Sequence, residues 1–156
     1  MTDEIAALVD DLVAARADFL TALEAVDPAR RSAPRLVGNW SARELVAHLG
    51  YWAGHAVEVI GAVETGRVGE VGVGERPVDD VNETVARVAR QADLATARKR
   101  EAASVLALLD RLAVLDPALL SERLPDGATL AKGIVEDGSA HYREHTDDLR
   151  SAVGDR

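Results

Sequence analysis

Apolar residues recur at helical spacing in four stretches of this chain, and polar segments rich in glycine and proline separate them. The first stretch covers residues 2–26, where apolar side chains return every three or four positions at Ile5, Leu8, Val9, Leu12, Phe19, Leu20 and Leu23. Pro28 and Pro34 follow this stretch, and a proline ends a helix. The pattern predicts an amphipathic first helix over residues 2–26.

The second predicted helix begins at Ser41 and extends to about residue 64. Glu44 stands three residues after Ser41, and an apolar run follows, which is the pattern of a capping box. In a capping box the serine and glutamate side chains each bond a free backbone N–H group of the first turn. We therefore expect a helix over residues 41–64.

A glycine-rich segment separates this helix from the next one. Residues 66–78 contain four glycines and one proline, so they cannot form the interior of a helix. The segment is longer than two adjacent bundle helices require. It is predicted to be a mobile cover near the mouth of a pocket, a short hairpin or a plain crossover connector.

Two more helices complete the pattern. A long third helix is predicted over residues 79–115, with an apolar face formed by Val81, Val85, Val88, Leu94, Val105, Leu109 and Leu112. A connector with one short turn at residues 117–121 follows, and a fourth helix is predicted over residues 129–153. These elements predict an all-α protein, an antiparallel four-helix bundle with a long glycine-rich loop between its second and third helices.

Composition and charge narrow the class of protein. The chain has 156 residues, which we expect to form a single domain, and 47% of them are hydrophobic but only 3% aromatic. A formal net charge of −9 argues against nucleic acid as a partner, because phosphate backbones are repelled. The chain contains no cysteine, which excludes cysteine-ligated zinc and a thiol nucleophile.

The sequence also bears on location and assembly. No apolar run approaches the roughly 18 residues that a membrane span needs. The acidic start, MTDEIAALVDD, lacks the basic region of a secretion signal. We therefore expect a cytoplasmic protein with no membrane span, and the sequence leaves a monomer and a homodimer both open.

The candidate chemistry lies in the histidines. His141 and His145 stand four residues apart in the fourth predicted helix, offset by about 40° and about 6 Å, so both imidazoles can reach one point in space. His48 lies at the edge of the inward stripe of the second helix. Three neutral imidazoles commonly hold a divalent metal with one position left open. We predict a mononuclear metal site formed by His48, His141 and His145.

Other interpretations of these residues stay open. Each of the three histidines could instead be a core residue that a carboxylate or water satisfies. His55 lies about 10 Å along the helix from His48, too far to bind the same ion, and is expected to line a pocket or to be partly exposed. Asp137, one turn before His141, is predicted either to orient a ligating imidazole or to lie on a solvated face.

Two motifs resemble a known family. The segment GNWSARELVAHLGYW, residues 38–52, is similar to the W-S/T-x-x-[DE]-L-x-x-H-L-x-x-W segment of the DinB-like superfamily. The segment AHYREHTDDL, residues 140–149, resembles its closing H-x-x-x-H helix. Within the superfamily, the first segment resembles the N-terminal domain of mycothiol-dependent maleylpyruvate isomerases. HYREH beside VDDVN is similar to the ClbS/DfsB branch, which includes a cyclopropane hydrolase that protects against a genotoxin.

The resemblance implies a fold and an activity. It implies a four-helix bundle that binds one divalent metal, zinc or nickel, through His48, His141, His145 and water. It implies a metal-dependent enzyme acting on a small electrophilic substrate, either as a thiol-dependent S-transferase or isomerase using a low-molecular-weight thiol such as mycothiol, or as a hydrolase. Asp148 stands where many thiol-transferase members have glutamine. The alternative is a non-catalytic metal-containing protein that binds or sequesters a small molecule.

Overall fold

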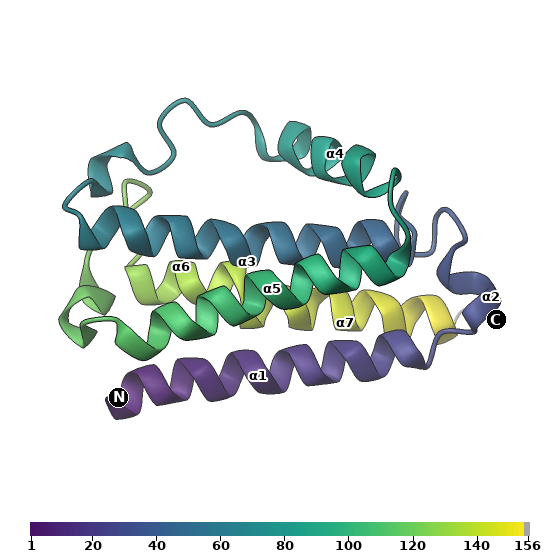
Figure 1. Cartoon of the computed structure of the whole chain (residues 1–156), viewed down its shortest axis with the longest axis horizontal. Helices are drawn as coiled ribbons and strands as arrows, with labels where there is room; N and C mark the ends of the chain where they lie inside the picture. The colour runs from purple at the N-terminus through teal and green to yellow at the C-terminus, as the bar shows by residue number, and fades with distance from the viewer. Residues whose placement is uncertain (155–156) are drawn as a thin grey trace.

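The computed structural model describes residues 1–154 and shows a bundle of helices with one helix outside it (Figure 1). Over these residues the bundle has four members, called here rods. Three are single helices, α1 (Asp3–Glu24), α3 (Ala42–Glu64) and α5 (Leu94–Val114), and the fourth is the consecutive pair α6 (Leu130–Asp137) and α7 (Ser139–Gly154). The short helices α2 (Pro28–Arg31), η1 (Val68–Glu70) and η2 (Pro117–Ser121) lie in the connections. The predicted all-α bundle is confirmed. Within the described residues, no helix is both long and apolar enough to cross a membrane.

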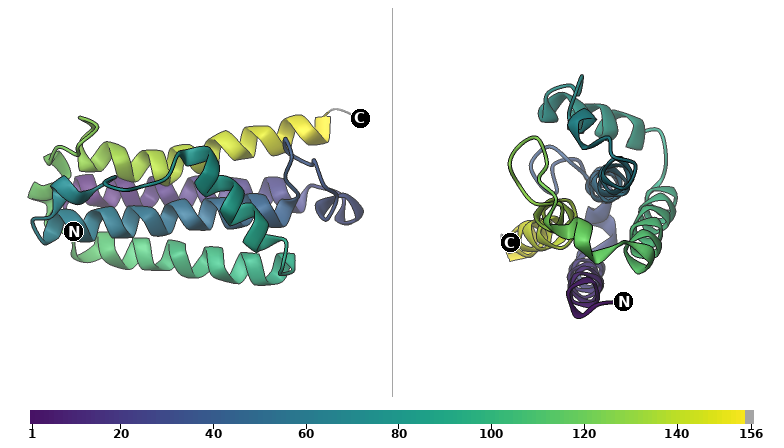
Figure 2. Two further views of the ribbon diagram at one scale, coloured as in Figure 1. Left: turned by 90° about the horizontal axis from the view of Figure 1, so that it is seen from above. Right: turned by 90° about the vertical axis from the view of Figure 1, so that its left-hand side faces the viewer.

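The directions of the rods explain the long connection after α3. α1 and the α6–α7 pair run one way along the bundle, whereas α3 and α5 run the other way (Figure 1). Because α3 and α5 are parallel neighbours, the chain must return to its starting end between them. The glycine-rich segment and α4 (Val78–Ala89) make this return on the outer side of α3 (Figure 2). The described segment contains η1 and turns, not a hairpin.

The predicted third helix is broken in two. α4 ends at Ala89, and α5 begins after Asp93, whose side chain accepts a hydrogen bond from the backbone N–H of Thr96 at 2.7 Å. This bond caps a new helix and lets the chain change direction. The valines predicted for the inner face of the N-terminal half lie on α4 outside the bundle, and Val88 is 50% exposed. The predicted apolar face was correct for the C-terminal half of this helix, which forms α5 and in which Val105 and Leu112 are buried.

The predicted fourth helix is also broken, at Gly138. Its backbone angles, φ −111° and ψ −108°, are not helical, so α6 ends at Asp137 and α7 begins at Ser139. A Cβ atom at Gly138 would lie 2.8 Å from the carbonyl oxygen of Ile134, and therefore only glycine fits. The break separates the turn that carries Asp137 from the turns that carry His141 and His145.

The start of α3 agrees with the sequence, although its cap differs in detail. Ser41 is the residue before the first helical turn, as the pattern predicted. Its hydroxyl donates a hydrogen bond to the carboxylate of Glu44 at 3.0 Å in place of the backbone bonds of a capping box. The other carboxylate oxygen of Glu44 lies 3.3 Å from Arg90, so the start of α3 is tied to the end of α4.

A buried charged residue joins three rods in the core. Glu101 on α5 is 2% exposed and accepts hydrogen bonds from Arg16 on α1 at 2.7 and 2.8 Å. The hydroxyl of Tyr142 on α7 also donates to this carboxylate. Directly opposite, a Cβ atom at Gly50 would lie 2.9 Å from the Cα atom of Glu101, so α3 and α5 approach closely there. The network fixes α7, which carries two of the candidate ligands, against α1 and α5.

Candidate metal centre

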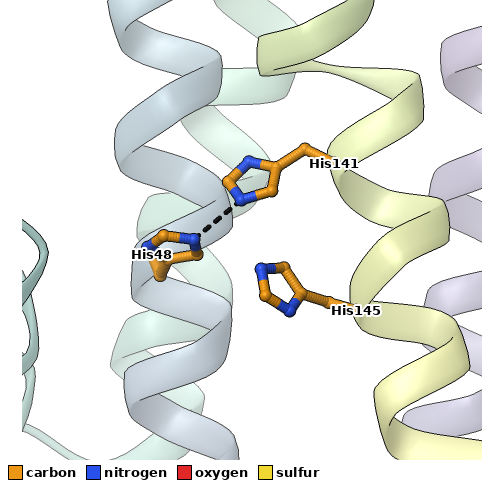
Figure 3. A group of neighbouring side chains, drawn as sticks. All are labelled: His48, His141 and His145. Carbon is orange, nitrogen blue, oxygen red and sulfur yellow. Dashed lines mark hydrogen bonds between the residues drawn. The ribbon is translucent and has the colours of Figure 1, made fainter. Parts of the chain in front are cut away.

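Two facing helices bring the candidate ligands together. His48 lies on α3 beside Leu45 and Leu49, which are fully buried, so the apolar pattern that packs α3 also turns His48 inward. His141 and His145 lie on successive turns of α7, four residues apart on one face. Figure 3 shows the three rings pointing toward one another from α3 and α7.

The ring nitrogens converge on one small space. Nε2 of His48 and Nε2 of His141 are 2.7 Å apart, and one nitrogen from each of the three rings lies within 4.8 Å of the other two. The ring centroid of His145 lies 5.1 Å from that of His48 and 4.8 Å from that of His141. Three imidazole nitrogens at this spacing are a set of ligands that could hold a metal ion.

The surroundings favour the uncharged imidazole at two of the three positions. Burial, reinforced by repulsion from His141 and His145, lowers the pKa of His48 to about 3. Burial, with repulsion from His145, lowers the pKa of His141 to about 4. A neutral imidazole is the form that binds a divalent metal, because its ring nitrogen keeps a lone pair. The donor set therefore fits a divalent metal at neutral pH.

A carboxylate orients one of these rings. Nδ1 of His145 lies 2.9 Å from the carboxylate of Asp148, an arrangement that leaves Nε2 for the shared space. Nδ1 of His48 is buried and has no hydrogen-bond partner within residues 1–154, while Trp40 covers the ring at a centroid distance of 4.6 Å. The family resemblance marked Asp148 only as a departure from the glutamine of many members, and the sequence pattern did not pair it with His145. Its position three residues after His145, on the same helix face, was the available signal.

The three rings open onto a hollow of about 380 Å³ between α3, α4 and α7. Trp40 and Trp52 form apolar walls of this hollow. The indole N–H of Trp52 donates to the side-chain oxygen of Asn82 on α4 at 3.0 Å, which holds α4 beside the hollow. The spacing of Asn82 within the third predicted helix gave no sign of this contact, because it depends on how α4 folds back on α3.

His55 lies apart from the three-histidine group, as its distance along α3 predicted. Its Nδ1 is 2.7 Å from the carboxylate of Asp137 on α6, and its Nε2 is 3.2 Å from the carboxylate of Glu75 in the crossover. Asp137 thus orients His55 and not a ring of the three-histidine group. The hydrogen bond with Asp137 is the main cause that raises the pKa of His55 to about 9, against the effect of burial.

Two solved structures are similar to this chain. An uncharacterised protein from Escherichia coli UTI89 superposes with a TM-score of 0.79 at 16% identity, over 94% of this chain and 91% of that one. A mycothiol-dependent maleylpyruvate isomerase superposes with a TM-score of 0.72 at 18% identity, over 96% of this chain and 63% of the isomerase. This chain therefore spans less than two thirds of the isomerase. At these identities the likeness shows a shared fold. No curated protein matches the sequence.

The sequence itself identifies the family. The model of the DinB superfamily matches residues 11–147, which include α3, the first part of α7 and all three converging histidines. This match agrees with the resemblance of the two histidine-containing motifs and with the fold of the neighbours. The chain belongs to the DinB superfamily.

Proposed function

We propose that this protein is a metal-dependent enzyme that acts on a small electrophilic molecule, with zinc or nickel held by His48, His141 and His145. The convergence of three ring nitrogens within 4.8 Å is the observation that carries the proposal. Two of these rings are kept neutral by burial, which suits metal ligation. The membership of the chain in the DinB superfamily supports the same function.

The surrounding residues would prepare the site for this chemistry. When bound, the metal would supply a thiolate or hydroxide at neutral pH by lowering the pKa of a coordinated thiol or water. Asp148 holds the ring of His145 so that Nε2 faces the shared space. Trp40 and Trp52 add apolar surface to the walls of the hollow, against which an apolar part of a substrate could pack.

A low-molecular-weight thiol such as mycothiol is the proposed nucleophile. The chain contains no cysteine, so a thiolate at the metal would have to come from another molecule. The mycothiol-dependent isomerase among the similar structures supports this choice. A hydrolase that uses metal-activated water is the second candidate, and the resemblance favours it because Asp148 replaces the glutamine of many thiol-transferase members.

Metal analysis followed by turnover assays tests the proposal. Protein purified without a nickel-affinity tag should contain about one zinc or nickel ion per chain, or bind one on titration. The loaded protein should then consume a model electrophile such as monobromobimane faster with mycothiol than with water alone. A water-only reaction of equal rate would assign the hydrolase instead.

A matched variant serves as the control in the metal analysis. His55→Gln alters a histidine on the same helix that lies outside the three-histidine group, so metal content should be unchanged. Protein that neither contains nor binds a metal would show that the three histidines are structural. Stoichiometric capture of the electrophile without turnover would assign a binding protein in place of an enzyme.

A further inference from the structure

A second hollow adjoins the metal centre. It is a cavity of about 530 Å³ between α3, α6 and the crossover, called here the α3–α6 cavity and lined in part by Ala56, Val59, Leu130 and Ile134. Its lining includes Glu136 and Asp137, which also line the hollow of the three histidines. The two spaces therefore lie on either side of the same turn of α6. The volume of the cavity suits a small organic molecule.

The order of residues on the facing helices places the two spaces in line, and together they are called here the groove. Along α3, the turns after His48 carry Trp52, then His55, then Val59, and the last two line the α3–α6 cavity. The α6–α7 pair runs in the opposite direction (Figure 1), so the matching turns are those of His141, then Asp137, then Ile134. His55 lies about 10 Å along the axis from His48. A molecule about that long could reach from the metal centre into the cavity.

The bridge between His55 and Asp137 marks the boundary between the two spaces. It joins α3 to α6 through a 2.7 Å contact, and Glu75 of the crossover adds a 3.2 Å contact to the same ring. His55 is protonated at neutral pH because these carboxylates raise its pKa to about 9. Its positive charge is offset by the two carboxylates that contact it.

The walls and charges of the groove define what it can bind. The cavity walls are mostly aliphatic, whereas the polar lining consists of His55 and the carboxylates Glu75, Asp126, Glu136 and Asp137. Among residues 1–154, no lysine or arginine lines the cavity or the hollow at the metal centre. Lys132 lies 3.4 Å from Glu136, but its side chain is 66% exposed. In the metal-free chain, carboxylates therefore outnumber the single cation of the cavity lining, and the cavity repels anions.

We propose that the α3–α6 cavity binds the body of the substrate, and that this body is apolar, elongated and without anionic groups. The proposal rests on the proposed metal centre for the position of the reacting end. The cavity and its charges are properties of the chain alone. The substrate class is thus neutral or cationic electrophiles with an aliphatic or aromatic extension, in preference to carboxylates and phosphates.

Binding to the metal-free protein tests the cavity by itself. Three probes share a six-carbon chain and differ in end group: hexylammonium, hexanol and hexanoate. In amide chemical-shift titrations, hexylammonium and hexanol should shift the signals of Val59 and Ile134, and hexanoate should bind about three- to tenfold more weakly at low salt. Equal or tighter binding of hexanoate would overturn the proposal, as would shifts confined to other surfaces.

Paired variants link the binding to this cavity. Val59→Phe fills the space and should abolish binding, whereas Val88→Phe, at a half-exposed position of α4, should leave it unchanged. Glu136→Lys keeps the cavity open but reverses one charge, and should bring hexanoate to the affinity of hexanol. Glu4→Lys, at the exposed start of α1, should not. Unchanged selectivity in Glu136→Lys would contradict the electrostatic part of the proposal even if Val59→Phe failed to fold.

Cobalt-substituted protein tests whether the cavity serves the metal centre. The thiols 6-mercaptohexanol and 6-mercaptohexanoate carry the same chain, and a thiolate-to-cobalt absorption band reports their binding. 6-Mercaptohexanol should bind more tightly than 6-mercaptohexanoate and more tightly than the shorter 2-mercaptoethanol. In Val59→Phe, the affinity for 6-mercaptohexanol should fall to that for 2-mercaptoethanol. Absence of the band with every thiol would reject the thiol-dependent form of the proposed function, and the metal-free titrations would still decide whether the cavity binds the probes. If the band appears but the affinity depends neither on the length of the thiol chain nor on the charge of its end group, only the inference about the substrate body is rejected.

Discussion

The carboxylate of Asp148 accepts a hydrogen bond from Nδ1 of His145 at 2.9 Å, three residues further along α7. This contact fixes the ring nitrogen that faces the shared space, so Asp148→Ala should weaken zinc binding by about 10- to 100-fold. Asp147→Ala provides the control, because Asp147 is exposed and its ion-pair partner is Arg150, 4.0 Å away. Competition with a fluorescent chelator measures both affinities. An equal loss in the two variants would mean that Asp148 does not position the ring.

The three candidate ligands should differ sharply from His55. His48→Ala, His141→Ala and His145→Ala should each lose the metal or bind it much more weakly, because two imidazoles remain. His55→Ala should retain it, since His55 is held by Asp137 and Glu75. The melting temperatures of wild type and His55→Ala should fall when a chelator is added, and those of the three ligand variants should not. Loss of metal in His55→Ala alone would show that the ligand set is wrong.

Two glycines on α3 should respond oppositely to alanine. A Cβ atom at Gly50 would lie 2.9 Å from the backbone of Glu101, so Gly50→Ala must push α3 and α5 apart and should destabilise the fold by about 1–3 kcal/mol. At Gly54 the nearest atom would be the Ser104 hydroxyl oxygen at 3.9 Å, an ordinary contact. Gly54→Ala should therefore stabilise the helix by about 0.5–1 kcal/mol. Urea unfolding distinguishes them, and two shifts of the same sign would contradict the close approach.

The contribution of His55 to stability should disappear in alkali. Its pKa is raised from 6.5 to about 9 in the fold, mainly by Asp137 and further by Glu75. A raised pKa means that the charged form stabilises the fold fully below pH 6.5 and that this contribution is lost as the pH rises through 9. The unfolding free energy of chelator-treated wild type should exceed that of His55→Ala by about 1–2 kcal/mol near pH 6, after allowance for solvent screening. A difference that grows toward pH 9 would reverse the assigned sign.

The buried network around Glu101 should be far more sensitive than a surface ion pair. Arg16→Met leaves the carboxylate of Glu101 buried without its bidentate partner, and should destabilise the fold by about 3–5 kcal/mol. Arg98→Met removes a pair with Glu24 whose two side chains are 41% and 53% exposed. That change should cost at most about 1 kcal/mol. Similar losses in both variants, measured by denaturant unfolding, would mean that Glu101 is not a structural centre.

Local patterns predicted the features that depend on one helix at a time. The apolar period located α1 and α3 within two residues of their bounds, and the four-residue spacing of His141 and His145 fixed their common direction. The breaks within the third and fourth predicted helices were missed for a local reason. The cap at Asp93 and the single glycine at Gly138 each interrupt an apolar period that continues on the other side.

Contacts between helices were harder to predict. The pair of His55 and Asp137 depends on the rotation of α3 relative to α6, and nothing in the spacing of either residue specifies it. The contact of Asn82 with Trp52 likewise requires that α4 fold back beside α3. The family resemblance supplied the partnership of His48 with the α7 pair, which spacing alone could only suggest.

The separation of the ligands along the chain gives the proposed centre a mechanical consequence. His48 and His141 are 93 residues apart in sequence, so an ion bound by both would close a loop that contains most of the protein. Closing a loop of this size costs the unfolded chain about 4 kcal/mol of entropy, and the folded bundle has already met that cost. A lone α7 offers two ligands, and the third arrives only when α3 docks. Occupancy of the centre would therefore report assembly of the bundle, because all three ligands are available only when α3 and α7 are docked.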